Sequence, residues 1–156
     1  DTNATNGSAS YFINSTTAQG GGGIRGIYNN SGDGGIGVGG ALNAEYLGIN
    51  GNSDIYAIDL TTSSTSSNQI FHTLDSTTYR SAKYLIQLKS GSSYQVEELL
   101  IIHDGTSAYI TEYAVTRSGL NLSTFDADVS GGNLRLLVTP LNAVTTYKAT
   151  CTGIRD

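Results

Sequence analysis

The chain has 156 residues, the size of one ordinary domain with a sizeable core, and it is too short to hold two large enzyme domains. Charged residues make up only 13% of it, and it contains 20 glycines, one proline, one cysteine, and no methionine or tryptophan. The formal net charge of −5 and the eight scattered Lys and Arg residues argue against a phosphate-binding surface, so we expect no nucleic-acid partner.

The residue types favour strands and turns over helices. Thr, Tyr, Val and Ile, which suit strands, are common, whereas the helix formers Glu, Lys and Arg are scarce. No apolar run approaches the roughly 20 residues that span a bilayer, and no basic segment followed by an apolar one opens the chain. We therefore expect an all-β protein without membrane insertion. Because the first residue is Asp1 and not Met, we also expect the chain to be processed or to be a segment of a longer one.

Glycine divides the chain into two unlike regions. Fourteen of the twenty glycines lie in residues 1–67 and only six lie in residues 68–156. The Ser/Thr tract at 61–67 has no apolar face to pack, so we place the boundary there. The N-terminal region holds only short apolar pieces, which predicts an extended or short-stranded assembly or attachment region that is helped to order by neighbouring chains or by a surface. Its Gly20–Gly23 run lacks the Lys-Ser/Thr of a phosphate-binding loop, so a glycine-rich loop or close chain packing is favoured.

Residues 68–156 predict an antiparallel β-sandwich of about seven strands separated by turns. The predicted strands are Gln69–Leu74, Ala82–Lys89, Tyr94–His103, Ala108–Thr116, Thr124–Val129, Leu134–Thr139 and Thr145–Thr152. Asp104-Gly105, which lies between two apolar runs, predicts a hairpin with a two-residue turn. Leu99–Ile102 is continuously apolar, which predicts a strand covered on both faces. A helix over Val96–Ile102 is the competing interpretation, and the Asp-Gly turn that follows counts against it.

The sequence offers no clear catalytic set. Nucleophilic catalysis needs a Ser or Cys together with a His and usually a carboxylate, but the only histidines are His72 and His103. Cys151 has no evident His partner and fits a small buried residue. His103-Asp104 could be an acid/base pair, although a strand end that enters a hairpin explains it better. We therefore predict that the chain is not an enzyme and has no catalytic residue and no cofactor.

Metal ligands are also sparse. One Cys and two His are too few for a structural zinc site. Calcium is harder to dismiss, because Asp33 and the pair Asp126/Asp128 are candidate oxygen donors, yet neither matches a calcium-binding loop. We interpret Asp126 and Asp128 as the solvent face of a strand and predict no metal site.

Two further residue sets bear on sugars. Paired carboxylates for glycosidic cleavage could come from Glu97, Glu98, Glu112 or Asp128, whose separation in space the sequence does not give. Ten tyrosines could supply a sugar-binding or protein-binding face, although most are expected to pack the sandwich or its rim. Asn-x-Ser/Thr sequons at 3, 6, 14, 29 and 121 are expected to arise by chance in a chain so rich in these residues.

Several segments, taken in order, resemble a module of virion structural and tail-fibre-like proteins of tailed phages, notably cyanophages. The segments are Tyr79–Gln87, Tyr94–Tyr109, Thr111–Tyr113, Thr124–Asp128 and Gly132–Pro140. The resemblance covers residues 68–156, and the first 67 residues are similar only to glycine-rich fibre or capsid-appendage sequences in general. It implies a β-sandwich at the end of a longer chain, commonly in homotrimers on the particle, with no catalytic residue to carry over.

Two classes of function remain open. The first is a non-enzymatic virion structural protein, assembled in the host bacterial cytoplasm, that forms a fibre-like appendage of tail, neck or capsid. Its partners would be other copies of itself and other virion proteins, and a capsid decoration protein is a variant of this class. The second class is a carbohydrate-binding or weakly hydrolytic module for host surface glycans, which would use exposed tyrosines or two carboxylates.

Overall fold

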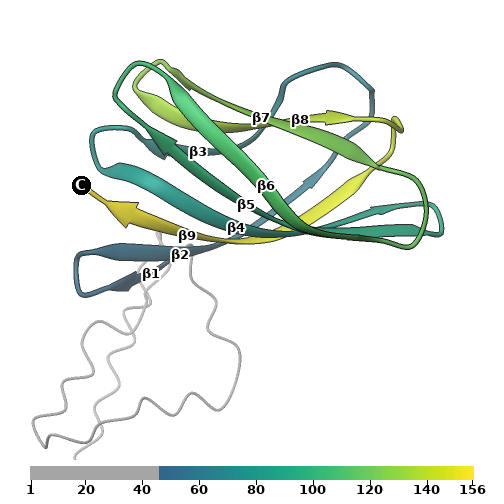
Figure 1. Ribbon diagram of the computed structural model, residues 1–156, viewed down its shortest axis with the longest axis horizontal. Helices are drawn as coiled ribbons and strands as arrows, with labels where there is room; N and C mark the ends of the chain where they lie inside the picture. Colours follow the sequence, from purple (N-terminus) through teal and green to yellow (C-terminus); the bar gives the residue numbers. More distant parts are fainter. Residues whose placement is uncertain (1–45) are drawn as a thin grey trace, which may run out of the picture. The chain divides into compact units, whose positions relative to one another are not determined.

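The computed structural model describes residues 46–156, and this part of the chain consists of nine β-strands without a helix (Figure 1). The strands are β1 (Tyr46–Ile49), β2 (Ser53–Thr61), β3 (Gln69–Asp75), β4 (Tyr79–Ser90), β5 (Ser93–His103), β6 (Ala108–Arg117), β7 (Ser123–Ser130), β8 (Asn133–Pro140) and β9 (Thr146–Arg155). The all-β prediction is confirmed, and the competing helix over Val96–Ile102 is wrong because these residues lie in β5. Within residues 46–156 no helix exists that could cross a membrane.

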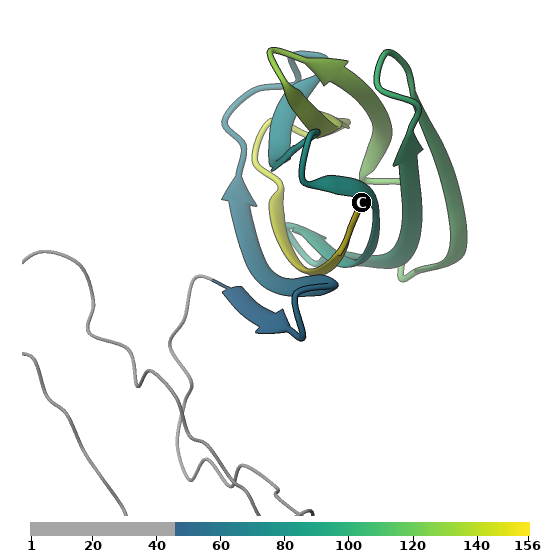
Figure 2. The same ribbon diagram turned by 90° about the vertical axis from the view of Figure 1, so that its left-hand side faces the viewer.

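The strands form two antiparallel sheets that face each other (Figures 1 and 2). One sheet has six strands in the order β1-β2-β9-β4-β5-β6, and the other has three in the order β3-β8-β7. The seven strands predicted for residues 68–156 correspond to β3 through β9, and no predicted end differs from the observed one by more than three residues. The predicted sandwich is therefore confirmed.

The Ser/Thr tract at 61–67 connects β2 of the six-stranded sheet with β3 of the other sheet. β2 pairs with β9 at nine positions, from Ser53 opposite Ile154 to Thr61 opposite Thr146. Two strands N-terminal to the predicted boundary thus take part in the six-stranded sheet. The predicted role of residues 1–67 in assembly stays a prediction, since residues 1–45 lie outside the described part of the chain.

The core lies between the two sheets. Along the central strands every second side chain is buried, which is the pattern of a sheet with one packed face. Fully buried side chains come from both sheets: Tyr84, Ile86, Leu88, Leu99, Leu134, Leu136, Val138 and Tyr147. Cys151 is fully buried among them, as predicted, and its burial raises the pKa of the thiol to about 12, so the thiol stays protonated and unreactive.

The hairpin between β5 and β6 pairs as Asp104-Gly105 predicts, with His103 opposite Ala108. The turn differs from the expected one, however. The backbone N–H of Asp104 donates to the carbonyl of Ser107 (3.1 Å), which makes Gly105 and Thr106 the central residues, and of these only Gly105 has a positive φ, of 103°. Asp104 instead accepts the N–H groups of Thr106 (2.9 Å) and Ser107 (2.8 Å) through its carboxylate. The dipeptide therefore works as a side-chain cap followed by a left-handed glycine.

A buried carboxylate joins three strands at one end of the six-stranded sheet. Asp54 on β2 is 1% exposed and forms an ion pair with Arg155 on β9, whose Nε and Nη2 lie 2.9 and 2.8 Å from Asp54 Oδ2. The hydroxyl of Tyr79 on β4 donates to the same oxygen, and the hydroxyl of Tyr56 lies 2.6 Å from that of Tyr79. Because these groups are bonded to one another, the buried charge is compensated on the β4 and β9 sides.

We predict that Asp54→Asn lowers the free energy of unfolding by about 2 kcal/mol, because it removes the charge and leaves Arg155 with a weaker partner. The effect should stay below that of a fully buried pair, since 35% of the Arg155 side chain is exposed. Urea unfolding of the full chain measures it. Asp59→Asn, on the exposed side of the same strand, is the matched control and should change the value by less than about 0.5 kcal/mol. Equal effects of the two substitutions would contradict the role of Asp54.

Candidate interaction surface

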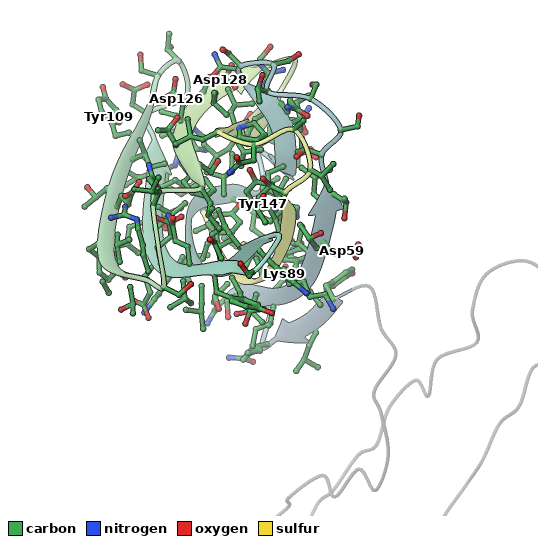
Figure 3. All side chains as sticks on the ribbon, turned by 90° about the vertical axis from the view of Figure 1, so that its right-hand side faces the viewer. Asp59, Lys89, Tyr109, Asp126, Asp128 and Tyr147 are labelled. Carbon is green, nitrogen blue, oxygen red and sulfur yellow. The ribbon has the colours of Figure 1, made fainter. Side chains whose placement is uncertain are left out.

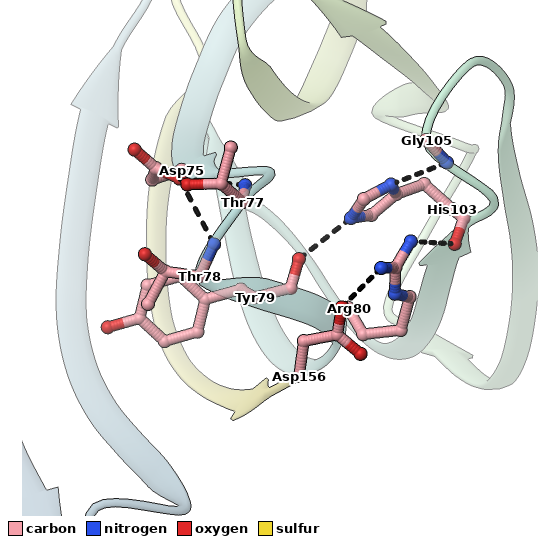
Figure 4. A network of polar contacts seen from close by, with 8 residues as sticks. All are labelled: Asp75, Thr77, Thr78, Tyr79, Arg80, His103, Gly105 and Asp156. Atoms are coloured by element: carbon pink, nitrogen blue, oxygen red, sulfur yellow. Dashed lines mark hydrogen bonds and ion pairs between the residues drawn. The ribbon is translucent and has the colours of Figure 1, made fainter.

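Backbone contacts hold the His103 ring inside the β5–β6 hairpin, away from any catalytic pairing with Asp104. Its Nε2 donates to the Tyr79 carbonyl at 2.7 Å and its Nδ1 accepts the Gly105 N–H at 3.0 Å (Figure 4). Asp104 faces its own turn, where the N–H groups of Ser107 and Thr106 lower the pKa of its carboxyl to about 2. The predicted interpretation as a strand end entering a hairpin matches this geometry.

His72 is the second histidine, and it lies on β3 against aromatic rings. Its Nδ1 is 3.0 Å from the hydroxyl of Tyr84, and its ring centroid is 5.3 Å from that of Tyr56. Burial lowers the pKa of His72 to about 4, so the ring is uncharged at neutral pH. His72 is therefore not positioned as the base, nor Cys151 as the nucleophile, of a catalytic pair.

Of the four candidate carboxylates, the structure brings only Glu97 and Glu112 together. Glu97 points to the interior face, where it is buried, and Glu112 points to the same face because it is opposite the fully buried Leu99 in register. Glu98 points to the other face, where it pairs with Lys83 at 2.8 Å. The fourth, Asp128, lies on the three-stranded sheet.

Only 1% of the Glu97 surface is exposed, and its carboxylate accepts two hydrogen bonds of 3.2 Å from the side-chain amide of Gln95. Gln95 in turn accepts the N–H of Leu122 at 2.9 Å. Among the described residues no ion pair involves Glu97. Burial, and to a smaller extent the charge of Glu112, raise the pKa of Glu97 to about 7. This carboxyl is therefore a buried acid, inaccessible to a polymeric substrate in this conformation.

The candidate metal donors are arranged for other contacts. Asp128 forms an ion pair with Arg135 across the β7–β8 pair, and Asp126 accepts the N–H of Ala127 at 2.8 Å. Figure 3 labels the two aspartates. Within residues 46–156 no three His, Cys, Asp or Glu side chains gather as a metal site would require. Asp33, Gly20–Gly23 and the sequons at 3, 6, 14 and 29 lie outside the described residues. The remaining sequon residue, Asn121, has its side-chain oxygen buried without a hydrogen-bond partner.

The surface that stands out is the outer face of the six-stranded sheet, which we define as the side chains that point away from the three-stranded sheet. On β5, Leu99 and Ile101 are buried, whereas Leu100 and Ile102 are 48% and 49% exposed on the outer face. The prediction that Leu99–Ile102 is covered on both faces is therefore wrong for the described residues. Both faces of β5 are apolar along this run, but the described residues of a single chain cover only one of them.

Exposed apolar side chains recur across the outer face on β1, β9, β5 and β6, and we call them the apolar band; Ser53 on β2 and Ser81 on β4 lie between them. In register, Ile102 is opposite Tyr109 on one side and Ser81 on the other, and Ser81 is opposite Ile154. The band consists of Leu47, Ile49, Leu100, Ile102, Tyr109 and Ile154, each between 44% and 56% exposed. Its centre is a shallow hollow of about 430 Å³ around the small side chain of Ser81.

Tyr109, the most exposed member of the apolar band, is fixed in place (Figure 3). Its hydroxyl donates to Asp104 Oδ2 at 2.9 Å, and the other oxygen of Asp104 is held by two backbone N–H groups of the turn. A ring that is already ordered loses little conformational entropy when a partner binds. The Asp104–Ser107 turn thus orients a contact residue, a role that sequence reasoning did not assign to it.

No protein-family model matches the chain, and no curated protein matches it. Solved structures, in contrast, do match the chain. The chain is similar to tailspike proteins of tailed phages. One is the tailspike of Acinetobacter baumannii phage AM24, with a TM-score of 0.37 and 9% identity over 67% of this chain. Another is the tailspike of Acinetobacter phage vB_ApiP_P1, with a TM-score of 0.36 and 15% identity over 79% of this chain. A third is the tailspike gp49 of Acinetobacter baumannii bacteriophage Fri1, described as a capsular polysaccharide depolymerase, with a TM-score of 0.40 and 12% identity over 70% of this chain.

The alignments are loose and cover only 26%, 19% and 25% of the AM24, Fri1 and vB_ApiP_P1 tailspikes. This chain thus spans about a quarter or less of those proteins. No site residue of theirs is carried over to it, because TM-scores of 0.36 to 0.40 do not align individual side chains.

The buried Glu97 predicts a specific pH dependence of stability. Its pKa is raised from 4.5 in the unfolded chain to about 7 in the folded one, so its contribution is fully present below pH 4.5 and is lost as the pH rises through 7. The loss amounts to about 3 kcal/mol. We therefore expect Glu97→Gln to become more stable relative to the parent chain between pH 5 and pH 8, as measured by urea unfolding.

Comparison of the two proteins at each pH isolates Glu97, because the opposite effect of His72, whose neutral form is favoured in the folded state, is common to both. Glu98→Gln, on the outer face of the same strand, is the control and should not reproduce the trend. A stability difference between Glu97→Gln and the parent that is constant from pH 5 to pH 8 would show that the carboxyl titrates normally.

Proposed function

We propose that the chain is a non-enzymatic structural module of a tailed-phage appendage, and that the apolar band is the surface through which it contacts its neighbours. The single observation that carries the proposal is the second apolar face of β5, where Leu100 and Ile102 stay about half exposed. An antiparallel sheet with one solvated face normally carries polar residues there. The apolar band departs from that pattern across β1, β9, β5 and β6.

Burial of this band would contribute to association. Apolar surface removed from water stabilises by roughly 25 cal/mol per Å², and a standard interface takes about 800 Å² from each partner. Exposed apolar patches larger than a few hundred Å² commonly mark interaction sites on soluble proteins. The ordered ring of Tyr109 at the end of the band fits the aromatic anchors that dominate such interfaces.

The contacts and burial of the candidate catalytic groups support a non-enzymatic role. The His103 ring is engaged by backbone groups of its hairpin and of β4, and Glu97 lies inside the sandwich. The sequence resemblance to virion structural and tail-fibre-like proteins supports a location on the phage particle, with other copies of the chain, in a homotrimer, and other virion proteins as partners. A capsid decoration protein is the variant of this proposal in which the band contacts the shell.

We predict that Ile102→Glu prevents incorporation of the chain into phage particles while the isolated chain still folds. A carboxylate at this position would be desolvated in the interface, whereas in the free chain it stays half exposed and should change the unfolding free energy by less than about 1 kcal/mol. Quantitative mass spectrometry of purified particles, with urea unfolding in parallel, measures both effects.

Thr73→Glu, on an exposed position of β3 in the other sheet, is the control and should be incorporated normally. Incorporation of Ile102→Glu at the parent level would contradict the proposal. Gold-labelled antibody on intact particles then assigns the position, since label spread over the shell indicates decoration and label confined to the tail or neck indicates a fibre.

A further inference from the structure

One end of the sandwich, on the right in Figure 1, is formed by four loops, and we call it the loop end. The loops join β2 to β3 (62–68), β4 to β5 (91–92), β6 to β7 (118–122) and β8 to β9 (141–145). Three apolar side chains of these loops are exposed: Leu120 to 87%, Val144 to 65% and Leu141 to 51%. Leu120 and Val144 are the two most exposed large hydrophobic side chains of the described residues. We call the three side chains the loop tips.

Hydrogen bonds between the loops fix the backbone that carries the loop tips. The N–H of Leu141 donates to the Leu122 carbonyl at 2.9 Å, which joins the β8–β9 loop to the β6–β7 loop. The hydroxyl of Ser90, at the end of β4, donates to the Val144 carbonyl, also at 2.9 Å. A loop that is already ordered loses little conformational entropy when a partner binds. The loop end is therefore a preformed contact surface.

The β8–β9 loop, which carries two of the loop tips, satisfies its own carbonyl groups. Each of the four carbonyls from residue 142 to residue 145 accepts a hydrogen bond of 2.9–3.0 Å from within the protein. The donors are, in this order, the hydroxyls of Thr145, Thr62 and Ser90 and the N–H of Thr62. A backbone that enters an apolar environment must satisfy its polar groups internally, because it finds no water there. This loop meets that requirement.

The charge beside the loop tips is positive. The four loops and the strand ends next to them (61–68, 89–94, 117–124 and 140–147) contain two cations, Lys89 and Arg117, and no Asp or Glu, in a chain whose net charge is −5. Both cations are exposed, and Figure 3, which looks onto this end, labels Lys89. Beyond these segments Asp59 and Lys148 lie opposite each other, and Asp126 is the first acid of β7. The loop end is thus more positive than the chain as a whole.

A tyrosine lies beside one of these cations. Tyr94, the second residue of β5, is 46% exposed, and the ammonium of Lys89 lies 5.6 Å from the centroid of its ring. Tyrosine is enriched where proteins meet the boundary between lipid and water, because its ring is apolar and its hydroxyl is polar. Lysine and arginine act at the same boundary, where they attract anionic head groups.

The arrangement of these groups selects the kind of partner. A stable protein interface takes about 800 Å² of closely packed surface from each side. The loop tips are instead separate side chains, with Ser, Thr and Asn between them in the loops. Separate apolar side chains can each enter the head-group region of a bilayer, where buried apolar area and attraction to anionic lipids add up.

We propose that the loop end docks on an anionic phospholipid surface, with Leu120, Leu141 and Val144 in the head-group region and Lys89 and Arg117 against the phosphates. Such a contact lies on the bilayer and does not span it. The inference goes beyond the appendage role and uses no residue of the apolar band. It therefore stands or falls independently of whether Ile102→Glu is incorporated into particles.

Flotation of the full 156-residue chain with lipid vesicles tests the inference. One set of vesicles contains equal parts of phosphatidylglycerol and phosphatidylethanolamine, and the other contains phosphatidylcholine alone. We expect the chain to bind the anionic vesicles, less tightly as sodium chloride is raised, and to bind the neutral vesicles about tenfold more weakly.

Substitutions assign the contact to the loop end. Leu120→Ser should lower the affinity for anionic vesicles about fivefold or more, because it removes inserted apolar surface. Leu85→Ser is the matched control, since Leu85 is 47% exposed in the middle of β4, and it should bind like the parent. Lys89→Gln combined with Arg117→Gln should lower the affinity about tenfold and remove most of the salt dependence. Urea unfolding confirms that each variant is folded.

Fluorescence reports whether the tip enters the lipid. The chain contains no tryptophan, so Leu120→Trp supplies its only indole. Its emission should shift to shorter wavelength when anionic vesicles are added.

Three results would overturn the inference: no flotation with anionic vesicles at millimolar lipid, unchanged binding of Leu120→Ser, or emission of Leu120→Trp that does not shift on bound vesicles. Loss of Leu120→Ser from phage particles, without vesicle binding by the parent chain, would identify the loop end as a contact with another virion protein.

Discussion

The sandwich depends on β9, the last strand of the chain, because this strand hydrogen-bonds on both of its edges. It pairs with β2 at nine positions on one side and with β4 at ten on the other, and so joins β1 and β2 to β4, β5 and β6 (Figure 1). Its inward side chains Tyr147 and Cys151 are fully buried, and Arg155 carries the ion pair with Asp54. The six-stranded sheet is therefore completed only when strands about a hundred residues apart have met, a pairing of high contact order.

The completed sheet accounts for the surface on which the proposed function rests. Six strands side by side produce a broad outer face, and the three-stranded sheet lies against the inner face only. Residues that are far apart in sequence, such as Ile49, Ile102 and Ile154, lie in one transverse row because β9 fixes their register. The apolar band thus lies on a face that exists only in the assembled sheet.

The sequence predicted the strands well and the surface poorly. Alternation of buried and exposed residues, together with turn residues, located all seven strands of residues 68–156, because both signals are local. Asn50-Gly51, where both residues have positive φ, is a local signal from which the β1–β2 hairpin could be predicted. The approach of Glu112 to Glu97 and the ion pair of Asp54 with Arg155 depend on strand order, which periodicity does not contain. The continuous apolar run at Leu99–Ile102 predicts cover on both faces of β5, whereas the described residues cover only one of them.

The central claim is that the outer face of the six-stranded sheet is a contact surface in the assembled particle. Cryo-electron microscopy of intact particles, at a resolution that allows this sheet to be fitted, tests it most directly. The account predicts density from a neighbouring chain against Leu100, Ile102 and Ile154. Particles in which this face is open to solvent, while another face of the sandwich makes the contacts, would contradict it.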